Sequence, residues 1–300
     1  MSRQQASGQR KKNGARRRVK MRSALLLTLW GAMVTMLWQA LRSSLLALDT
    51  LASALAWLLP AALGLLLVDG DQRRLVPARA LTAEQTWRLA LAGVLCAAPV
   101  TLLVNVLAAL AGMQSAGSAG MAVGRGAALL IPLLLKSMLL VPLCEELFFR
   151  GYLLQVRAPY GRRAAVLATA LLFALSHVGR GMLPFALLGV LLAALTLRTG
   201  SLLAPLLVHG AYNGAVVLMS FAGLSPLFDR LSLLSCALRV AMCAGLAREL
   251  SLAWRTRPSG KRVCLYSGGR LSIREGLLLL LALLAMLAAA VLPFLLPEAT

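Results

Sequence analysis

The sequence predicts an all-α protein, a polytopic membrane helical bundle with about eight to nine transmembrane helices. Two observations support this fold class. Hydrophobic residues make up 60% of the 300 residues and charged residues only 14%, whereas soluble domains are about 45–50% apolar. The apolar residues also fall into long runs separated by basic stretches, and the mean hydropathy is +0.81.

The predicted elements begin with a polar arm. Residues 1–22 carry nine Lys and Arg among polar residues, and we expect a disordered, basic cytoplasmic arm. A secretory signal is the competing interpretation, but no small-residue cleavage pattern ends the first apolar run. Some of the runs that follow are shorter than the ~20 residues that a straight span needs. The candidate spans are 24–41, 45–68, 89–111, 127–156, 164–178, 182–197, 201–222, 231–247 and 276–297.

These runs divide the chain into parts. After the basic arm 1–22 come N-terminal transmembrane helices in 23–126, a central transmembrane core in 127–222 and C-terminal transmembrane helices in 223–300. A basic loop at 248–275, rich in Gly, Ser and Arg, interrupts the last part.

The basic residues predict the orientation. If the spans alternate from a cytoplasmic N-terminus, most of the 31 Lys and Arg lie in the arm and in cytoplasmic loops. Cytoplasmic loops of membrane proteins are enriched in these residues, so the distribution supports a cytoplasmic N-terminus and nine crossings. Eight crossings remain the alternative if one short segment does not span.

The formal net charge of +21 raises the question of a nucleic-acid partner. Aromatic residues are only 5%, however, and the basic residues are concentrated in the arm and loops. We therefore expect no nucleic acid, and we expect the basic loops to contact anionic lipid at the cytoplasmic face. The five cysteines show no CxxC spacing, so we interpret them as reduced small side chains rather than as a zinc cage.

Charged residues interrupt one of the apolar runs. Glu145, Glu146 and Arg150 lie within 127–156. A charge at membrane depth costs about 2.5–3.5 kcal/mol on insertion scales, so such residues usually face the protein interior and have a function. Glu146 and Arg150 are four residues apart on one helix face, which predicts an ion pair. The alternative is a juxtamembrane charge cluster outside the bilayer.

The two histidines of the chain both lie in apolar runs. Phe173 and His177 are four residues apart, as are His209 and Asn213, so each pair shares a helix face. A lone histidine of this kind is more often a structural residue that joins helices. Two histidines together with two glutamates, an arginine and an asparagine exceed what helix packing needs, which favours a functional site.

These side chains suit the hydrolysis of an amide bond. A glutamate beside a histidine can accept a proton from water, and an asparagine with a second histidine can donate hydrogen bonds to an oxyanion. The same residue types can hold Zn²⁺, and the ligands would then be Glu146, His177 and His209. The sequence contains no HExxH motif, so no cofactor is favoured and zinc is the alternative.

Three motifs occur in order in the central core. They are Glu145-Glu146-x-x-x-Arg150, Phe173-x-x-x-His177 and His209-x-x-x-Asn213. This ordered set resembles the CPBP family of intramembrane proteases, which includes CAAX prenyl endopeptidases and bacteriocin-processing or immunity proteins of the Abi type. Residues 1–90 and 225–300 carry no such motif.

The resemblance implies an intramembrane endopeptidase with 127–222 as its catalytic core. It implies that Glu145 or Glu146 activates the attacking water with His177 beside it, and it favours a glutamate mechanism over a metalloprotease. His209 and Asn213 would hold the oxyanion, Phe173 would wall the pocket and Arg150 would orient the carboxylates. The expected substrate is a membrane-embedded peptide or protein in a bacterial cytoplasmic membrane. The resemblance does not imply that this substrate is prenylated.

Two other function classes remain open. One is a non-proteolytic immunity or scaffold membrane protein that keeps the motifs for binding. The other, less favoured, is a proton-coupled transporter, because intramembrane carboxylates and histidines also line proton paths. An asparagine four residues after a histidine favours oxyanion chemistry over a proton relay.

The three motifs can meet only at depth in the membrane. The helix that carries the glutamates must therefore continue through residues 151–155, which places them roughly 15 Å from its Arg157 end. Pro142 would kink or open this helix and free backbone carbonyls that only a cavity or a neighbouring helix can satisfy. We expect a water-filled cavity reachable from the cytoplasmic half, with His177 within about 10 Å of a glutamate.

Overall fold

The computed structural model describes residues 22–35, 37, 46–66, 76–110, 129–157, 161–177, 182–222 and 233–255, with isolated residues between 273 and 284. A helix at Arg22–Thr35 comes first. The elements that follow are α2 (Leu46–Ser53), η1 (Ala54–Leu58), α3 (Leu59–Leu66), α4 (Ala83–Leu110), α6 (Leu130–Leu135), η4 (Lys136–Leu140), α7 (Val141–Glu146), η5 (Leu147–Leu153), α8 (Leu154–Arg157), α9 (Arg162–Leu175), α10 (Met182–Thr199), α11 (Leu203–Phe221) and α13 (Leu233–Arg255). The η elements are π-helical, so their N–H groups bond carbonyls five residues earlier.

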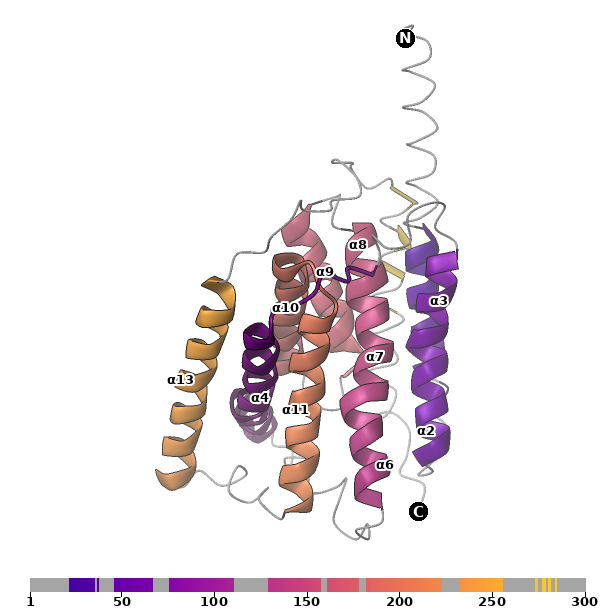
Figure 1. The fold of residues 1–300 in the computed structure, drawn as a ribbon. Helices are drawn as coiled ribbons and strands as arrows, with labels where there is room; N and C mark the ends of the chain where they lie inside the picture. Colours follow the sequence, from indigo (N-terminus) through magenta and orange to yellow (C-terminus); the bar gives the residue numbers. More distant parts are fainter. Residues whose placement is uncertain are drawn as a thin grey trace, which may run out of the picture.

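The helices stand side by side in one bundle (Figure 1). The elements from α6 to α8 join end to end into one helical run over residues 130–157, which we call the glutamate helix. α11 packs against this helix, and α4 packs against α11. α13 packs on α4 at the edge of the bundle, and α9 packs with α10.

Most of the described residues are helical, and these residues form no β-strand, only an isolated bridge between Ala78 and Ser201. The all-α fold class is therefore confirmed for this part of the chain. Two helices, Ala83–Leu103 and Leu203–Phe221, are long and apolar enough to cross a membrane. The expected eight to nine spans are not confirmed, because other apolar helices are shorter and charges interrupt the glutamate helix. The shorter helices are Arg22–Thr35, Thr50–Leu66 and Leu183–Thr199.

The glutamate helix continues past Glu145 and Glu146 to Arg157, as expected if the three motifs are to meet within the membrane. At 1.5 Å per residue it is about 40 Å long. Pro142 stands in the first turn of α7, with the π-helical segment η4 before it and η5 after the glutamates. A proline removes one backbone N–H, and the wider π-turns mark the places where the regular bonding changes.

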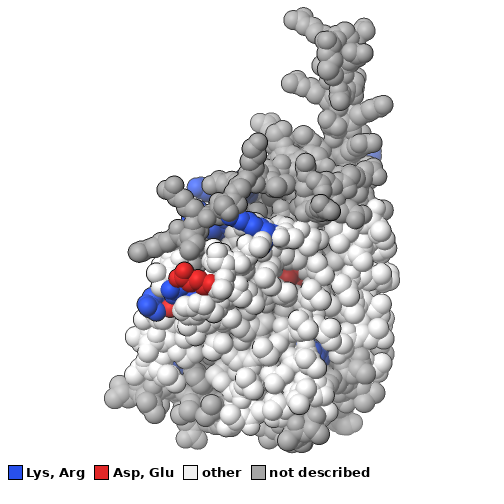
Figure 2. Space-filling model, in the orientation of Figure 1, with Lys and Arg blue, Asp and Glu red and all other residues white. Residues whose placement is uncertain are grey.

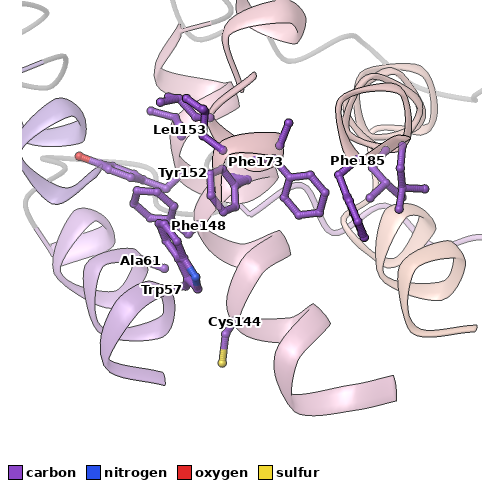
Figure 3. Close-up of a cluster of buried hydrophobic side chains, with 14 of the residues drawn as sticks. Trp57, Ala61, Cys144, Phe148, Tyr152, Leu153, Phe173 and Phe185 are labelled. Atoms are coloured by element: carbon purple, nitrogen blue, oxygen red, sulfur yellow. The ribbon is translucent and has the colours of Figure 1, made fainter. Parts of the chain in front are cut away.

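Buried aromatic side chains form a row across the bundle, from the helix of Trp57 to that of Phe185 (Figure 3). The ring centroid of Trp57 in η1 lies 5.4 Å from that of Phe148 and 4.8 Å from that of Phe149. Phe149 in turn meets Phe173 of α9 edge-on at 5.5 Å. Aromatic pairs stabilise by buried area and by ring geometry, so this row joins η1, the glutamate helix and α9.

Backbone contacts join the starts of α4 and α11. The N–H of Arg79 donates to Gly200 O at 3.2 Å, and the N–H of Leu202 donates to Pro77 O at 2.6 Å. Gly200 has φ of 66°, a left-handed conformation that glycine adopts readily. Because both helices begin at this junction, α4 and α11 run in the same direction.

Charge is unevenly distributed over the molecule. The face shown in Figure 2 is largely without charge, and most of its blue and red atoms gather towards the upper end. An uncharged surface of this extent suits contact with lipid, where exposed charges are costly.

Some predicted features lie outside the described residues. These are the arm up to residue 21, residues 256–272 of the basic loop, Cys264 and most of the run 276–297. The division of the chain into four parts stays a prediction.

Candidate active site

Both glutamates and Arg150 are buried, with exposures of 6% for Glu145 and 0% for Glu146 and Arg150. Arg150 Nη1 donates to Glu146 Oε1 at 2.8 Å, so the predicted ion pair is confirmed. The guanidinium also lies over the ring of Phe173, 4.2 Å from its centroid, and its Nη2 lies 3.4 Å from Gly189 O. Buried charges are costly unless they are paired, and these contacts provide that pairing.

Glu146 binds a second helix through the same oxygen. Its Oε1 lies 2.8 Å from Nδ1 of His209, a side chain of α11 that is 2% exposed. An ionised carboxylate only accepts hydrogen bonds, so His209 carries a proton on Nδ1. The other oxygen, Oε2, is buried and receives no hydrogen bond from the described residues. Glu146 is therefore held by its own helix and by α11 at once.

Glu145 faces the remaining nitrogen of both histidines. Its Oε2 lies 3.9 Å from Nε2 of His177 and 3.8 Å from Nε2 of His209. These separations are too long for direct hydrogen bonds, but one bridging water with bonds of about 2.8 Å spans them. The three motifs thus meet at one place, and the expected proximity of His177 to a glutamate is confirmed.

The ring of His177 is oriented by its neighbours at the end of α9. Its Nδ1 lies 2.9 Å from Phe173 O and 3.0 Å from Ser176 Oγ. A carbonyl only accepts, so Nδ1 carries the proton of the neutral ring and Nε2 presents its lone pair towards Glu145. Phe185 of α10 stacks on the imidazole, with centroids 4.5 Å apart and an interplanar angle of 18°.

Phe173 lies between the ion pair and the imidazoles. Its ring is fully buried, and its centroid lies 4.6 Å from that of His177 and 5.7 Å from that of His209. An apolar ring in this position keeps water away from the Arg150 guanidinium, which strengthens the electrostatic interactions of the cluster.

Asn213 is bonded to the backbone of the glutamate helix. Its Nδ2 donates to Ser137 O at 2.9 Å, and Ser137 belongs to η4. This is the kind of contact expected for a carbonyl freed by Pro142, since a neighbouring helix satisfies it. The oxyanion role that the resemblance implies for Asn213 stays a prediction.

The sequence did not single out Phe185, Ser137 or Gly210. A β-carbon at Gly210 would overlap Met138 O, so this glycine lets α11 approach the backbone of the glutamate helix closely. Gly210 and Gly214 have the small-xxx-small spacing of packed membrane helices, a signal that could have found the contact. Phe185 gave no comparable signal, because only the fold brings it onto His177.

Two of the three alternative zinc ligands are in direct contact, with Glu146 Oε1 2.8 Å from Nδ1 of His209. The third is His177, whose Nε2 lies 3.9 Å from Glu145 Oε2. The dependence of this site on a metal ion stays a prediction. In the described part of the chain, no group of three or more His, Cys, Asp or Glu is arranged to hold a metal ion.

Comparison with known proteins agrees with the motifs. Residues 127–215 match the family model described as type II CAAX prenyl endopeptidase Rce1-like. All three motifs and the whole cluster around Glu145 lie in this segment. No curated protein and no solved structure matches the chain. The resemblance to CAAX-type intramembrane proteases is thereby confirmed over the centre of the chain, and the match implies a membrane-embedded protease.

Proposed function

We propose that this protein is an intramembrane endopeptidase that hydrolyses a peptide bond of a membrane-anchored protein or peptide. One observation carries the proposal, the convergence of Glu145 Oε2 with Nε2 of His177 and of His209 at 3.9 and 3.8 Å. A water between these atoms has a carboxylate to take its proton and an imidazole to orient it. The match to an endopeptidase family over residues 127–215 supports the same reaction.

Glu145 is the general base. Its neighbour Glu146 already receives hydrogen bonds from Arg150 and His209 on one oxygen. Glu146 therefore orients His209, while Glu145 is directed at the space between the two Nε2 atoms. The two adjacent carboxylates have different roles because successive residues point about 100° apart around a helix.

The reaction proceeds by addition and elimination. As the water oxygen bonds to the carbonyl carbon of the substrate, Glu145 takes one water proton and His177 Nε2 accepts a hydrogen bond from the other. The carbonyl electron pair moves to the oxygen and forms an oxyanion. Glu145 then delivers its proton to the amide nitrogen as the C–N bond breaks, which releases an amine and a carboxylic acid.

The oxyanion requires donors close to the water. His209 donates from Nε2 when its ring carries both protons, since its Nδ1–H is bonded to Glu146. The resemblance also implies Asn213 as a donor, whereas one of its amide hydrogens is already bonded to Ser137 O. Removing one oxyanion donor costs about 10²–10³-fold in kcat in proteases.

The surroundings of the site suit a substrate that arrives through the membrane. Apolar side chains within two turns of Glu145 on the glutamate helix are exposed, with Leu139 at 52% and Leu140 at 42%. We propose a substrate already anchored in a bacterial cytoplasmic membrane, no resident cofactor, no nucleic-acid partner, and anionic lipid against the basic loops. The prenylated CAAX substrates named for the matched family are one class to test.

Substitution of Glu145 tests the reaction. Glu145→Gln keeps the shape of the side chain but removes the base, so we expect cleavage to fall by about 10²–10⁴-fold. Comparative membrane proteomics of wild-type and Glu145→Gln cells would identify the peptide that stays uncleaved, and the purified full-length protein in nanodiscs would then be assayed on it. Undiminished cleavage by the folded variant rules the proposal out, and retained protection or transport without cleavage supports the other classes.

The metal alternative has its own test. We expect cleavage by the purified protein to persist after treatment with a zinc chelator. Loss of cleavage on chelation and its return with added Zn²⁺ would support the metalloprotease alternative instead.

A further inference from the structure

Two π-helical segments of this protein end in the same way. In η1 the N–H of Leu59 bonds the carbonyl of Ala54, and in η4 the N–H of Val141 bonds the carbonyl of Lys136. The next residue in each case is a proline, Pro60 or Pro142. The next bonds in this pattern would reach Leu55 O and Ser137 O, but a proline has no N–H to donate.

In each segment a side chain from another helix supplies the missing donor. Trp30 Nε1 donates to Leu55 O at 2.9 Å, and Asn213 Nδ2 donates to Ser137 O at 2.9 Å. The two contacts have the same position relative to the proline and the same length. This agreement indicates that Asn213 has the same structural task as Trp30, that of completing a proline-opened helix.

The second contact lies beside the candidate active site. α11 meets the glutamate helix on both sides of Pro142, through Asn213 and Ser137 before it and through His209 and Glu146 after it. Close backbone approach is secured by Gly210, where a β-carbon would overlap Met138 O. A hinge at the proline is therefore fixed to α11 at two points.

We propose that Asn213 and Gly210 are positioning residues that hold the proline-opened glutamate helix against α11 and so hold Glu145 at its distance from the two histidines. This role differs from the oxyanion donation that the resemblance implies for Asn213. It rests on the proposed function, because its effect on catalysis exists only if Glu145 activates the water. Without the bond to Ser137, the helix can turn or tilt at Pro142 and move the carboxylate.

A double substitution separates the two roles of Asn213. Pro142→Ala restores an N–H five residues after Ser137, which can bond the freed carbonyl without Asn213. A positioning role predicts that Asn213→Ala lowers kcat by about 10²-fold, the effect of a misplacement near 1 Å, with KM little changed. In the Pro142→Ala background the same substitution should lower kcat by less than about threefold. An oxyanion donor would instead cost about 10²–10³-fold in both backgrounds, and that result overturns the proposal.

The segment at Trp30 provides the matched control. Trp30→Phe removes the equivalent bond to Leu55 O, and Pro60→Ala restores an N–H there. We expect Trp30→Phe to lower the melting temperature in nanodiscs, Pro60→Ala to reverse that loss, and kcat to stay within about twofold of wild type, since Trp30 holds a helix that carries no glutamate of the site. A fall in kcat as large as that of Asn213→Ala would show that both bonds act only through general stability, and it would overturn the catalytic positioning role.

A second variant keeps the test decisive if Pro142→Ala is itself inactive. Gly210→Ala forces Met138 O away and should lower kcat by at least about tenfold with KM little changed, an effect of helix displacement. Its control is Gly245→Ala in α13, where the new β-carbon would lie 3.2 Å from the mobile Cδ1 of Leu95. Wild-type kcat in a folded Gly210→Ala protein would overturn the proposal.

The outcomes are distinct from those that test the function. Failure of the wild-type protein to cleave any membrane peptide contradicts the proposed protease. Coupling between Asn213 and Pro142 is also measurable without a substrate. The melting temperature of the double variant should be higher than the value predicted by adding the changes measured for the two single variants. Cleavage by the wild type with no such coupling overturns only the positioning role.

Discussion

Two Glu–Arg pairs in this protein have the same spacing and the same length but different surroundings. Glu84 and Arg88 in α4, and Glu146 and Arg150 in the glutamate helix, are each four residues apart with a nitrogen–oxygen distance of 2.8 Å. The arginine and glutamate side chains are 15% and 58% exposed in the first pair and fully buried in the second. Spacing therefore predicts the pair, whereas its depth is decided by what packs around it.

The second partners of the two pairs differ as well. Arg88 Nη1 contacts Glu249 Oε2 of α13 at 2.7 Å, so the exposed pair also fastens α13 to α4. Glu146 instead accepts a hydrogen bond from His209, a ring that faces Glu145 on its other side. The first pair joins helices at the edge of the bundle, and the second places an imidazole beside a carboxylate that can act on water.

The largest effect is expected from breaking the buried pair. Arg150→Ala leaves the carboxylate of Glu146 buried without its cation, and removing one partner of a buried pair costs about 3–5 kcal/mol. We expect a strong fall in melting temperature in nanodiscs and loss of cleavage. Arg150→Lys keeps the charge but loses the planar fork, so its loss of activity should be smaller than that of the alanine variant. Full activity of the lysine variant would show that the planar guanidinium is not required for cleavage.

An intermediate effect is expected at the α4–α13 contact. Glu249 is 2% exposed and meets both Arg88 and Arg248. Glu249→Gln removes the charge, so we expect a lower melting temperature. Cleavage should fall by less than about threefold, because the lost charge pair joins α4 to α13 and lies away from the candidate active site. A loss of cleavage as large as that of Arg150→Ala would contradict the distinction between the two pairs.

The smallest effect is expected at the exposed end of the first pair. Glu84→Gln removes an acid that is 58% exposed, and exposed i,i+4 pairs contribute little. Melting temperature and cleavage should both stay close to wild type, with less than about a twofold change in rate. Measuring Glu84→Gln and Glu146→Gln side by side tests the comparison directly, since the two substitutions are chemically identical and differ in burial.

Much of the candidate site was predictable from spacing within single helices. The pairing of Glu146 with Arg150 and the shared face of Phe173 and His177 follow from the 3.6-residue turn. The order of the three motifs indicated the family. The number of membrane spans was less predictable, since helix length depends on where packing and loops end each helix rather than on hydrophobicity alone.

The choice between the two glutamates could not be made from the sequence. Glu145 and Glu146 are adjacent, so a change in helix winding decides which carboxylate faces both histidines, and η4 and η5 supply such changes on both sides. The bond of Asn213 to Ser137 could not be predicted from the sequence either. It depends on which backbone carbonyl Pro142 leaves without a donor, in a helix that is distant from Asn213 in the sequence.

The sequence by itself determined the all-α class, the position of a charged motif within an apolar run and the residue types available for hydrolysis. These properties are local, because composition and helical periodicity act over a few turns. Only the tertiary structure decided that Glu145 faces both imidazoles, that Glu146 binds His209, and that Phe185 orients His177. Such contacts depend on the axial position and rotation of one helix against another, which are set by close packing at places such as Gly210 and Met138.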